Sequence, residues 1–109
     1  MTIYREKLDL RERTGDHTHN VTIASTIALE ANKRRTGATF VNDSDAVIYL
    51  RLGQDAALNT GIRLNSAGGS YEINKTNLYK GDVTAIHGGA GNKVLCIIEL
   101  ESDYRLNEE

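Results

Sequence analysis

The feature that most constrains the fold is a succession of short strand-like segments, separated by turn residues, which runs from Val21 almost to the end of the chain. Such spacing is typical of antiparallel sandwiches and barrels. The chain contains no proline, so glycine, asparagine, aspartate and serine must supply the turns. We therefore predict an all-β fold, with a single antiparallel β-sandwich or barrel-like domain over residues 21–109.

The clearest of these segments is FVNDSDAVIYLRLG, residues 40–53. Its central NDSD stretch is rich in side chains that hydrogen-bond the backbone ahead of them, which predicts a turn between two strands of a hairpin. Side chains alternate along an extended chain, so Ile48, Leu50 and Leu52 share the face predicted to pack inward. The opposite face carries Tyr49 and Arg51, and we predict that it is an exposed interaction surface.

The remaining segments predicted to be strands are VTIAS, TIALEA, GATFVN, GIRLN, SYEIN, DVTAIH and KVLCIIELE. The last is the most continuously apolar, which favours a central strand covered on both faces. Cys96 lies within it and is predicted to be a small buried hydrophobe. His87 ends the preceding strand beside two glycines, so its ring is predicted to be exposed in a turn.

Residues 1–20 differ from the rest because they are mostly charged or polar. Leu8 and Leu10 alternate in the manner of a strand and form no helical stripe. We predict an extended N-terminal arm, with Leu8 and Leu10 as interface residues. Its YREKLDLRER portion also has the intrinsic propensity for a short helix, but a run of about ten residues is marginal in water without a surface to pack on. If the arm becomes ordered, we expect a neighbouring subunit to be the reason.

Composition restricts the possible classes of function. The 109 residues correspond to one domain, and the net charge of -2 disfavours nucleic-acid binding. The single cysteine rules out an internal disulfide framework. No apolar run reaches the roughly 18 to 20 residues that span a bilayer, and no secretion signal opens the sequence. We expect folding in a reducing cytosol, with no membrane partner.

Two histidines, His17 and His19, are the only candidate metal ligands that the spacing brings together. An extended backbone places both rings on one side, but two ligands are too few for a metal site. Three copies around a trimer axis would supply six nitrogens, an arrangement that resembles His-x-His metal sites in bacteriophage spike and fibre tips. A solvated or interface-packed pair is the alternative interpretation, and we predict no cofactor.

No set of residues in the sequence predicts catalysis. Three histidines, one cysteine and scattered carboxylates form no pattern of nucleophile, base and orienting group, so the chain is not predicted to be an enzyme. The basic cluster NKRR contains Arg34 and Arg35. These arginines are candidate contacts for phosphate or for an acidic neighbouring protein, or they are solvated at the entry to a strand.

The order of several segments resembles small β-rich virion structural proteins of tailed bacteriophages, of the head-decoration or minor-capsid type. The segments are NKRRTGATFVNDSDAVIYLRLG, GIRLN, GGSYEI, LYKGDVTAIH and VLCIIELE, and they cover about residues 25–101. The resemblance implies a small sandwich used as a virion component: a head decoration or cement protein, a head-fibre base or a tail-associated module. It carries over no catalytic residue.

These observations lead to one functional hypothesis and two alternatives. The hypothesis is a homo-oligomer, with a trimer favoured, that binds the major capsid protein or other virion proteins after assembly in the host cytoplasm. Its interface residues are predicted to be Leu8, Leu10, Arg34, Arg35, Tyr49 and Arg51. The alternatives are a head-fibre or tail-associated module that binds a receptor or glycan, and an intracellular enzyme or regulator.

Overall fold

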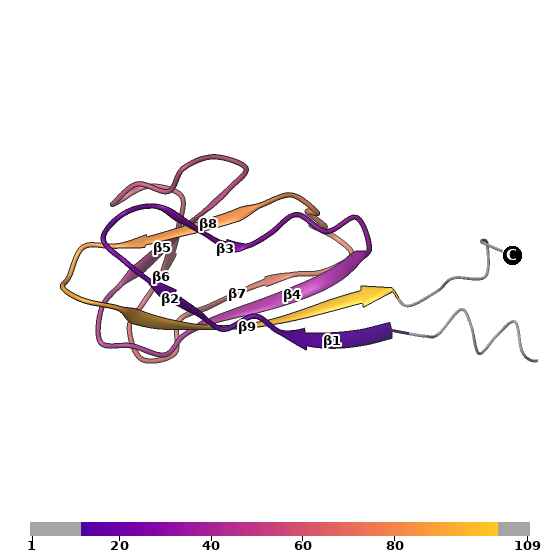
Figure 1. Ribbon diagram of the computed structural model, residues 1–109, viewed down its shortest axis with the longest axis horizontal. Coiled ribbons are helices and arrows are strands. Elements are labelled where there is room, and N and C mark those ends of the chain that lie inside the picture. The colour runs from indigo at the N-terminus through magenta and orange to yellow at the C-terminus, as the bar shows by residue number, and fades with distance from the viewer. Residues whose placement is uncertain (1–11, 103–109) are drawn as a thin grey trace, which may run out of the picture.

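The computed structural model describes residues 12–102, which form two antiparallel sheets packed face to face (Figure 1). Sheet A contains β1 (Glu12–Asp16), β2 (His19–Val21), β9 (Lys93–Ser102), β4 (Arg35–Asn42) and β7 (Ser70–Ile73). Sheet B contains β3 (Thr26–Leu29), β8 (Val83–His87), β5 (Ile48–Leu52) and β6 (Ile62–Leu64). The predicted all-β sandwich is therefore confirmed. Residues 12–102 include no helix that is long and apolar enough to cross a membrane.

The strand order is that of a jelly roll. β2 pairs with β9, β3 with β8, β4 with β7 and β5 with β6, as in one long antiparallel ribbon rolled into a two-layer sandwich. As a result, most successive strands belong to different sheets. Strands separated by the whole length of the domain, such as β2 and β9, become neighbours.

This topology makes the prediction of a hairpin over residues 40–53 wrong. β4 lies in sheet A and β5 in sheet B, so the NDSD turn is a corner between the layers. The fully buried Asn42 forms this corner, since its side-chain amide donates to the carbonyl oxygens of Ala46 at 2.7 Å and Leu64 at 3.0 Å. Ser44 donates in turn to the Asn42 side-chain oxygen.

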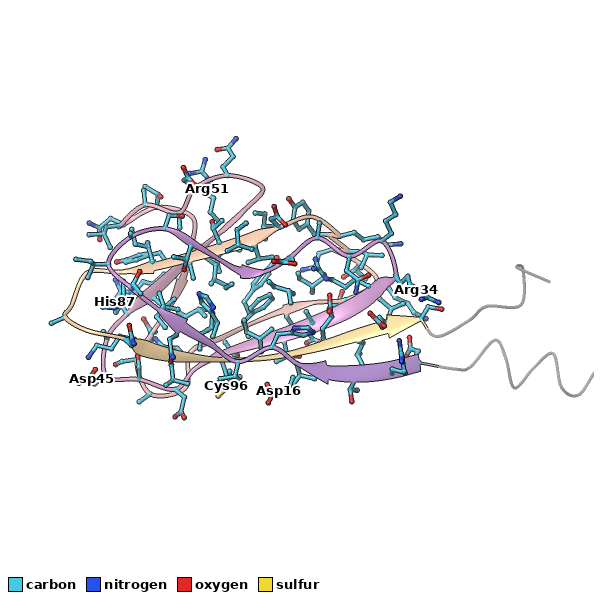
Figure 2. All side chains as sticks on the ribbon, in the orientation of Figure 1. Asp16, Arg34, Asp45, Arg51, His87 and Cys96 are labelled. Atoms are coloured by element: carbon cyan, nitrogen blue, oxygen red, sulfur yellow. The ribbon has the colours of Figure 1, made fainter. Side chains whose placement is uncertain are left out.

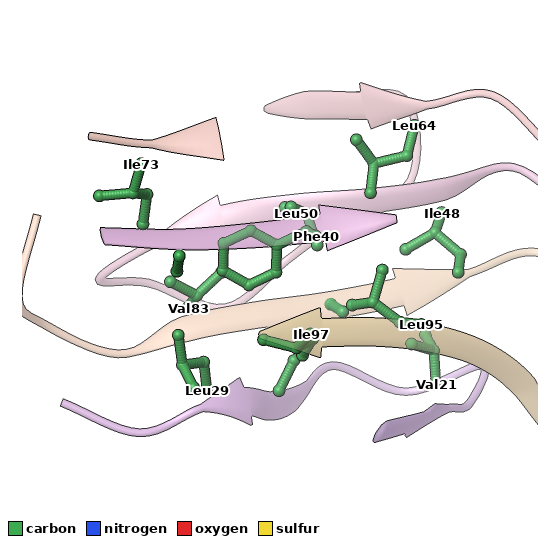
Figure 3. Close-up of a cluster of buried hydrophobic side chains, with 13 residues drawn as sticks. Val21, Leu29, Phe40, Ile48, Leu50, Leu64, Ile73, Val83, Leu95 and Ile97 are labelled. Carbon is green, nitrogen blue, oxygen red and sulfur yellow. The ribbon is translucent and has the colours of Figure 1, made fainter. Parts of the chain in front are cut away.

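The core fills the space between the layers with alternate side chains from both sheets (Figure 3). Ile48 and Leu50 are fully buried and Leu52 packs against the cluster, which confirms the predicted inward face of β5. From sheet A, Phe40 packs into the core and lies 6.3 Å from Tyr71, centroid to centroid.

The apolar strand β9 is covered on one face only within the described residues, so its predicted burial on both faces is wrong. Leu95 and Ile97 point into the core, whereas Ile98 is 45% exposed. Cys96 is half-buried on this outer face of sheet A. Figure 2 shows Cys96 and Asp16 projecting away from the core below sheet A.

The first described strands form one edge of sheet A. β1 and β2 keep a single register with β9, from Glu12 opposite Ser102 to Val21 opposite Lys93, and the His17 amide donates to Ile97 across the gap. The sheet therefore begins well before the predicted domain boundary at residue 21. Leu8 and Leu10 lie outside the described residues.

The prediction that His87 is exposed is wrong, because its ring is fully buried. Its Nδ1 accepts from the Gly89 amide at 2.9 Å, so Nε2 carries the hydrogen and donates to the Gly91 carbonyl at 2.7 Å. The ring thus holds the turn between β8 and β9 in place.

Candidate functional site

The candidate site is a groove between the two sheets, along one edge of the sandwich. Its walls are β1 from sheet A and the segment from Ile27 to Asn32 that includes β3 from sheet B. Both strands end their sheets, since β1 pairs only with β9 and β3 only with β8 among the described strands. The groove encloses about 670 Å³, and unpaired strand edges of this kind offer backbone donors and acceptors to an added chain.

A buried ion pair lies at the bottom of this groove. Glu99 lines the groove, and its Oε2 accepts from Nε of the fully buried Arg35 at 2.7 Å. The same guanidinium donates to the carbonyl oxygens of Tyr79, Gly81 and Glu30. Because these partners satisfy the charge, the pair holds together β9, β4 and the loops that end β3 and precede β8.

The ion pair extends to the surface through His17. Its Nε2 lies 3.1 Å from the second carboxylate oxygen of Glu99, and its side chain is 46% exposed. A side chain at Gly15 would meet this ring, since a Cβ atom there would lie 3.1 Å from Nε2. Glycine at this position therefore leaves the space in which His17 folds back towards Glu99.

Paired side chains also mark the two ends of the groove. At one end Glu101 accepts from Asn32 at 2.7 Å and from Arg13 at 2.8 Å. Both hydrogen bonds lower the pKa of the Glu101 carboxyl, and the bond from the Asn32 amide has the larger effect. At the other end His19 Nε2 lies 2.9 Å from the Thr26 hydroxyl, which joins the edges of the two sheets. Burial lowers the pKa of His19.

The two histidines therefore have separate partners within the chain. His17 lies in the gap between β1 and β2 and His19 begins β2. Nε2 of His17 faces Glu99, and Nε2 of His19 faces Thr26. Within residues 12–102, no group of three or more histidine, cysteine, aspartate or glutamate side chains is placed to hold a metal ion.

The predicted interface arginines occupy different environments. Arg35 is an internal residue of the ion pair, so the expectation that it is solvated at a strand entry is wrong. Arg34 is half-buried, and its carbonyl accepts from the Ser102 amide. Figure 2 places the Arg34 side chain at the end of the sandwich where β9 finishes and Arg51 on the far side of sheet B.

Tyr49 lies on the outer face of sheet B, as alternation predicts, but it is only 8% exposed. Its hydroxyl donates to the side chain of Asn59 at 2.9 Å, and Ala56 packs against the same small apolar cluster. The loop after β5 therefore covers the ring, and the predicted exposed tyrosine surface is wrong. Arg51 is half-buried and donates to Gln54.

An apolar strip runs along the outer face of sheet A. Its β9 residues are Val94, Cys96, Ile98 and Leu100, and Val41 of β4 lies opposite Cys96. Thr14, Asp16 and Thr39 border the strip in the neighbouring strands. We call these five apolar residues the β9 strip.

Sequence reasoning missed the groove and the β9 strip. Glu99 carried a signal, because it shares its side of the strand with the buried Leu95 and Ile97, and a charge on an inward-facing row needs a partner. Arg35 carried none, since a shift of register between Arg35 and Gly37 changes the alternation of β4.

In comparisons with known proteins, the chain matches no family model, no curated protein and no solved structure.

Proposed function

We propose that this chain is a structural protein of a tailed-phage virion, and that it decorates the head lattice as a homo-oligomer. The proposal begins from the order of segments, which resembles that of small phage structural proteins. The jelly-roll sandwich is compatible with it, because this architecture is used in viral capsid and lectin domains. Since one fold serves many functions, the particular surfaces of this chain must support the proposal.

The β9 strip is the observation that carries the proposal. Ile98, at its centre, is 45% exposed, and apolar strips rimmed by polar residues are typical of protein–protein interfaces. The strip lies on a continuous sheet, so its backbone is already ordered and little conformational entropy is lost on docking. We assign this face, in place of the Tyr49 face, to the contact with the capsid.

The proposed role requires no chemistry beyond binding. In the groove, Glu99, Glu101 and His17 each have a partner within the chain, as does His19 in the adjoining strand β2. Such fixed pairs favour a structural role over proton transfer. Many copies on a lattice reinforce weak contacts, because the first contact raises the effective concentration for the next. A small interface per copy is therefore sufficient.

The receptor- or glycan-binding alternative has less support from the structure than from the sequence. Tyr49 would have been its main stacking residue, and the ring is covered. A hollow of about 220 Å³ remains beside it, lined by Leu58, Asn59 and Gly88. A glycan array on which the protein binds strongly, with binding lost in Asn59→Ala, would favour this alternative.

Rebinding to stripped particles tests the proposal. Virions freed of the protein are mixed with the purified chain, and binding is measured by co-sedimentation and by the temperature at which the heads release DNA. Wild type should rebind and raise that temperature, while Ile98→Glu should bind at least tenfold more weakly. The matched control is Leu58→Glu, which alters a side chain of similar exposure beside Gly88, away from sheet A.

Failure of the wild-type chain to rebind, with no change in particle stability, would remove the decoration role. Equal loss of binding in both variants would show that the effect is not specific to the β9 strip.

A further inference from the structure

We infer that the groove between β1 and β3 receives residues 1–11 of a second copy of this chain. The inference rests on the proposed function, because an arm that crosses between copies presupposes a homo-oligomer. It adds the site at which the arm binds and the residues that recognise it.

The groove offers three means of holding an extended segment. The edge of β3 away from β8 is not paired with another described strand, so its backbone can pair with an added strand. Ile27 on this edge is 47% exposed and supplies an apolar contact. Glu30 is exposed at the rim, and its carboxylate has no hydrogen-bond or ion-pair partner within residues 12–102.

Residues 1–11 complement these features in sequence. They contain Arg5, Lys7 and Arg11 against Glu6 and Asp9, an excess of one positive charge. Among the carboxylates that line the groove, Glu99 pairs with Arg35 and Glu101 with Arg13, so Glu30 is the one that residues 12–102 leave without a counter-charge.

The apolar residues of the segment also match an apolar residue of the groove. Leu8 and Leu10 would share one side of an extended segment, with Lys7 on the other. In the groove, the two leucines would pack on Ile27 while the lysine reaches Glu30.

The geometry of β1 favours the groove of a second copy over the groove of the same copy. The chain enters sheet A at Glu12, opposite Ser102, and β1 runs from there along the groove, so the line of β1 extended backwards from Glu12 points away from the groove. To enter its own groove the segment would have to reverse at once, yet residues 10–14 contain no glycine, proline, asparagine, aspartate or serine. Eleven extended residues reach about 36–40 Å, enough to cross to a neighbouring domain.

Mixing single-cysteine variants tests this inference. In a Cys96→Ser background, the Leu8→Cys chain is mixed with the Ile27→Cys chain under mild oxidation, and disulfide-linked heterodimers are measured on a non-reducing gel. We expect a strong heterodimer band. The matched control replaces Ile27→Cys with Glu72→Cys, which is exposed on β7 at the opposite edge of sheet A and should give at least tenfold less product.

Charge reversal provides a second test with the otherwise native chain. Glu30→Lys should weaken self-association at least tenfold by sedimentation equilibrium, Glu72→Lys should leave it unchanged, and Lys7→Glu combined with Glu30→Lys should restore it. Circular dichroism checks that each variant is folded.

Three results would overturn the inference. They are a wild-type chain that stays monomeric, equal cross-linking to positions 27 and 72, and a Leu8→Cys/Ile27→Cys double variant that closes only within one chain. If the monomeric chain still rebound stripped virions, the proposed attachment to the head would stand, whereas the arm site and the homo-oligomer would be lost. If self-association followed the predicted pattern but the chain failed to rebind virions, the arm site would stand and the proposed decoration role would be lost.

Discussion

Replacing Glu99 by glutamine should be among the most destabilising single changes of charge in this protein. Glutamine keeps an oxygen that can accept from Arg35 Nε but removes the negative charge, and the guanidinium is 0% exposed. Its other partners are neutral carbonyl groups, so a buried cation remains without a counter-ion. Breaking a buried pair in this way costs about 3–5 kcal/mol, and we expect about 3 kcal/mol because one hydrogen bond is retained.

This loss is a large part of the total unfolding free energy, which is about 5–15 kcal/mol for a domain of this size. Urea unfolding followed by far-ultraviolet circular dichroism measures it, because the chain has no tryptophan. The control is Glu101→Gln, whose ion pair with Arg13 has side chains 25% and 54% exposed and should contribute at most about 1 kcal/mol. A Glu99→Gln loss no larger than that of the control would refute the reasoning.

Three further predictions concern the backbone and two histidines. Gly61→Ala should cost more than Gly91→Ala: both glycines have positive φ, at 78° and 74°, but an added Cβ atom would meet the backbone only at Gly61. Urea unfolding should show that Gly91→Ala lowers the unfolding free energy by about 1–2 kcal/mol, the cost of the strained conformation alone. Gly61→Ala should lower it by more. His87→Phe should lose about 1–3 kcal/mol by the same measurement, because two hydrogen bonds of the turn disappear, and an unchanged midpoint would contradict the assigned role. Burial lowers the pKa of His19, so the contribution of His19 to stability is complete above the unfolded pKa of about 6.5 and declines as the pH falls below that value. The difference in unfolding free energy between wild type and His19→Gln should therefore shrink from pH 7 to pH 5. A constant difference would contradict this prediction.

The sequence predicted most of the strands because alternation is a local property, although it missed β1 and extended a strand over residues 22–25. The inward face of β5 was identified from the alternation of Ile48, Leu50 and Leu52, and Ile48 and Leu50 are fully buried. The turn after Asn42 was also identified, but a local signal cannot show whether a turn joins neighbouring strands or passes from one sheet to the other. Here the answer depends on Leu64, whose carbonyl accepts from the Asn42 side chain across 22 positions of sequence.

The candidate site was less predictable because it is built from distant residues. Arg35 and Glu99 are separated by 64 positions, and no local pattern in the sequence places either beside the other. Tyr49 was assigned correctly to the outer face of β5, yet the loop that covers it is irregular and has no periodic pattern to reveal its path. Burial by such loops depends on tertiary contacts, here the bond to Asn59.

Cryo-electron microscopy of tailed-phage particles is the most direct test of the proposal that this chain is a virion protein. We predict density for a two-layer sandwich at repeated positions on the head lattice, with the outer face of sheet A, centred on Ile98, against the capsid. Absence of the sandwich from the lattice, or attachment through sheet B with Ile98 facing solvent, would contradict the account.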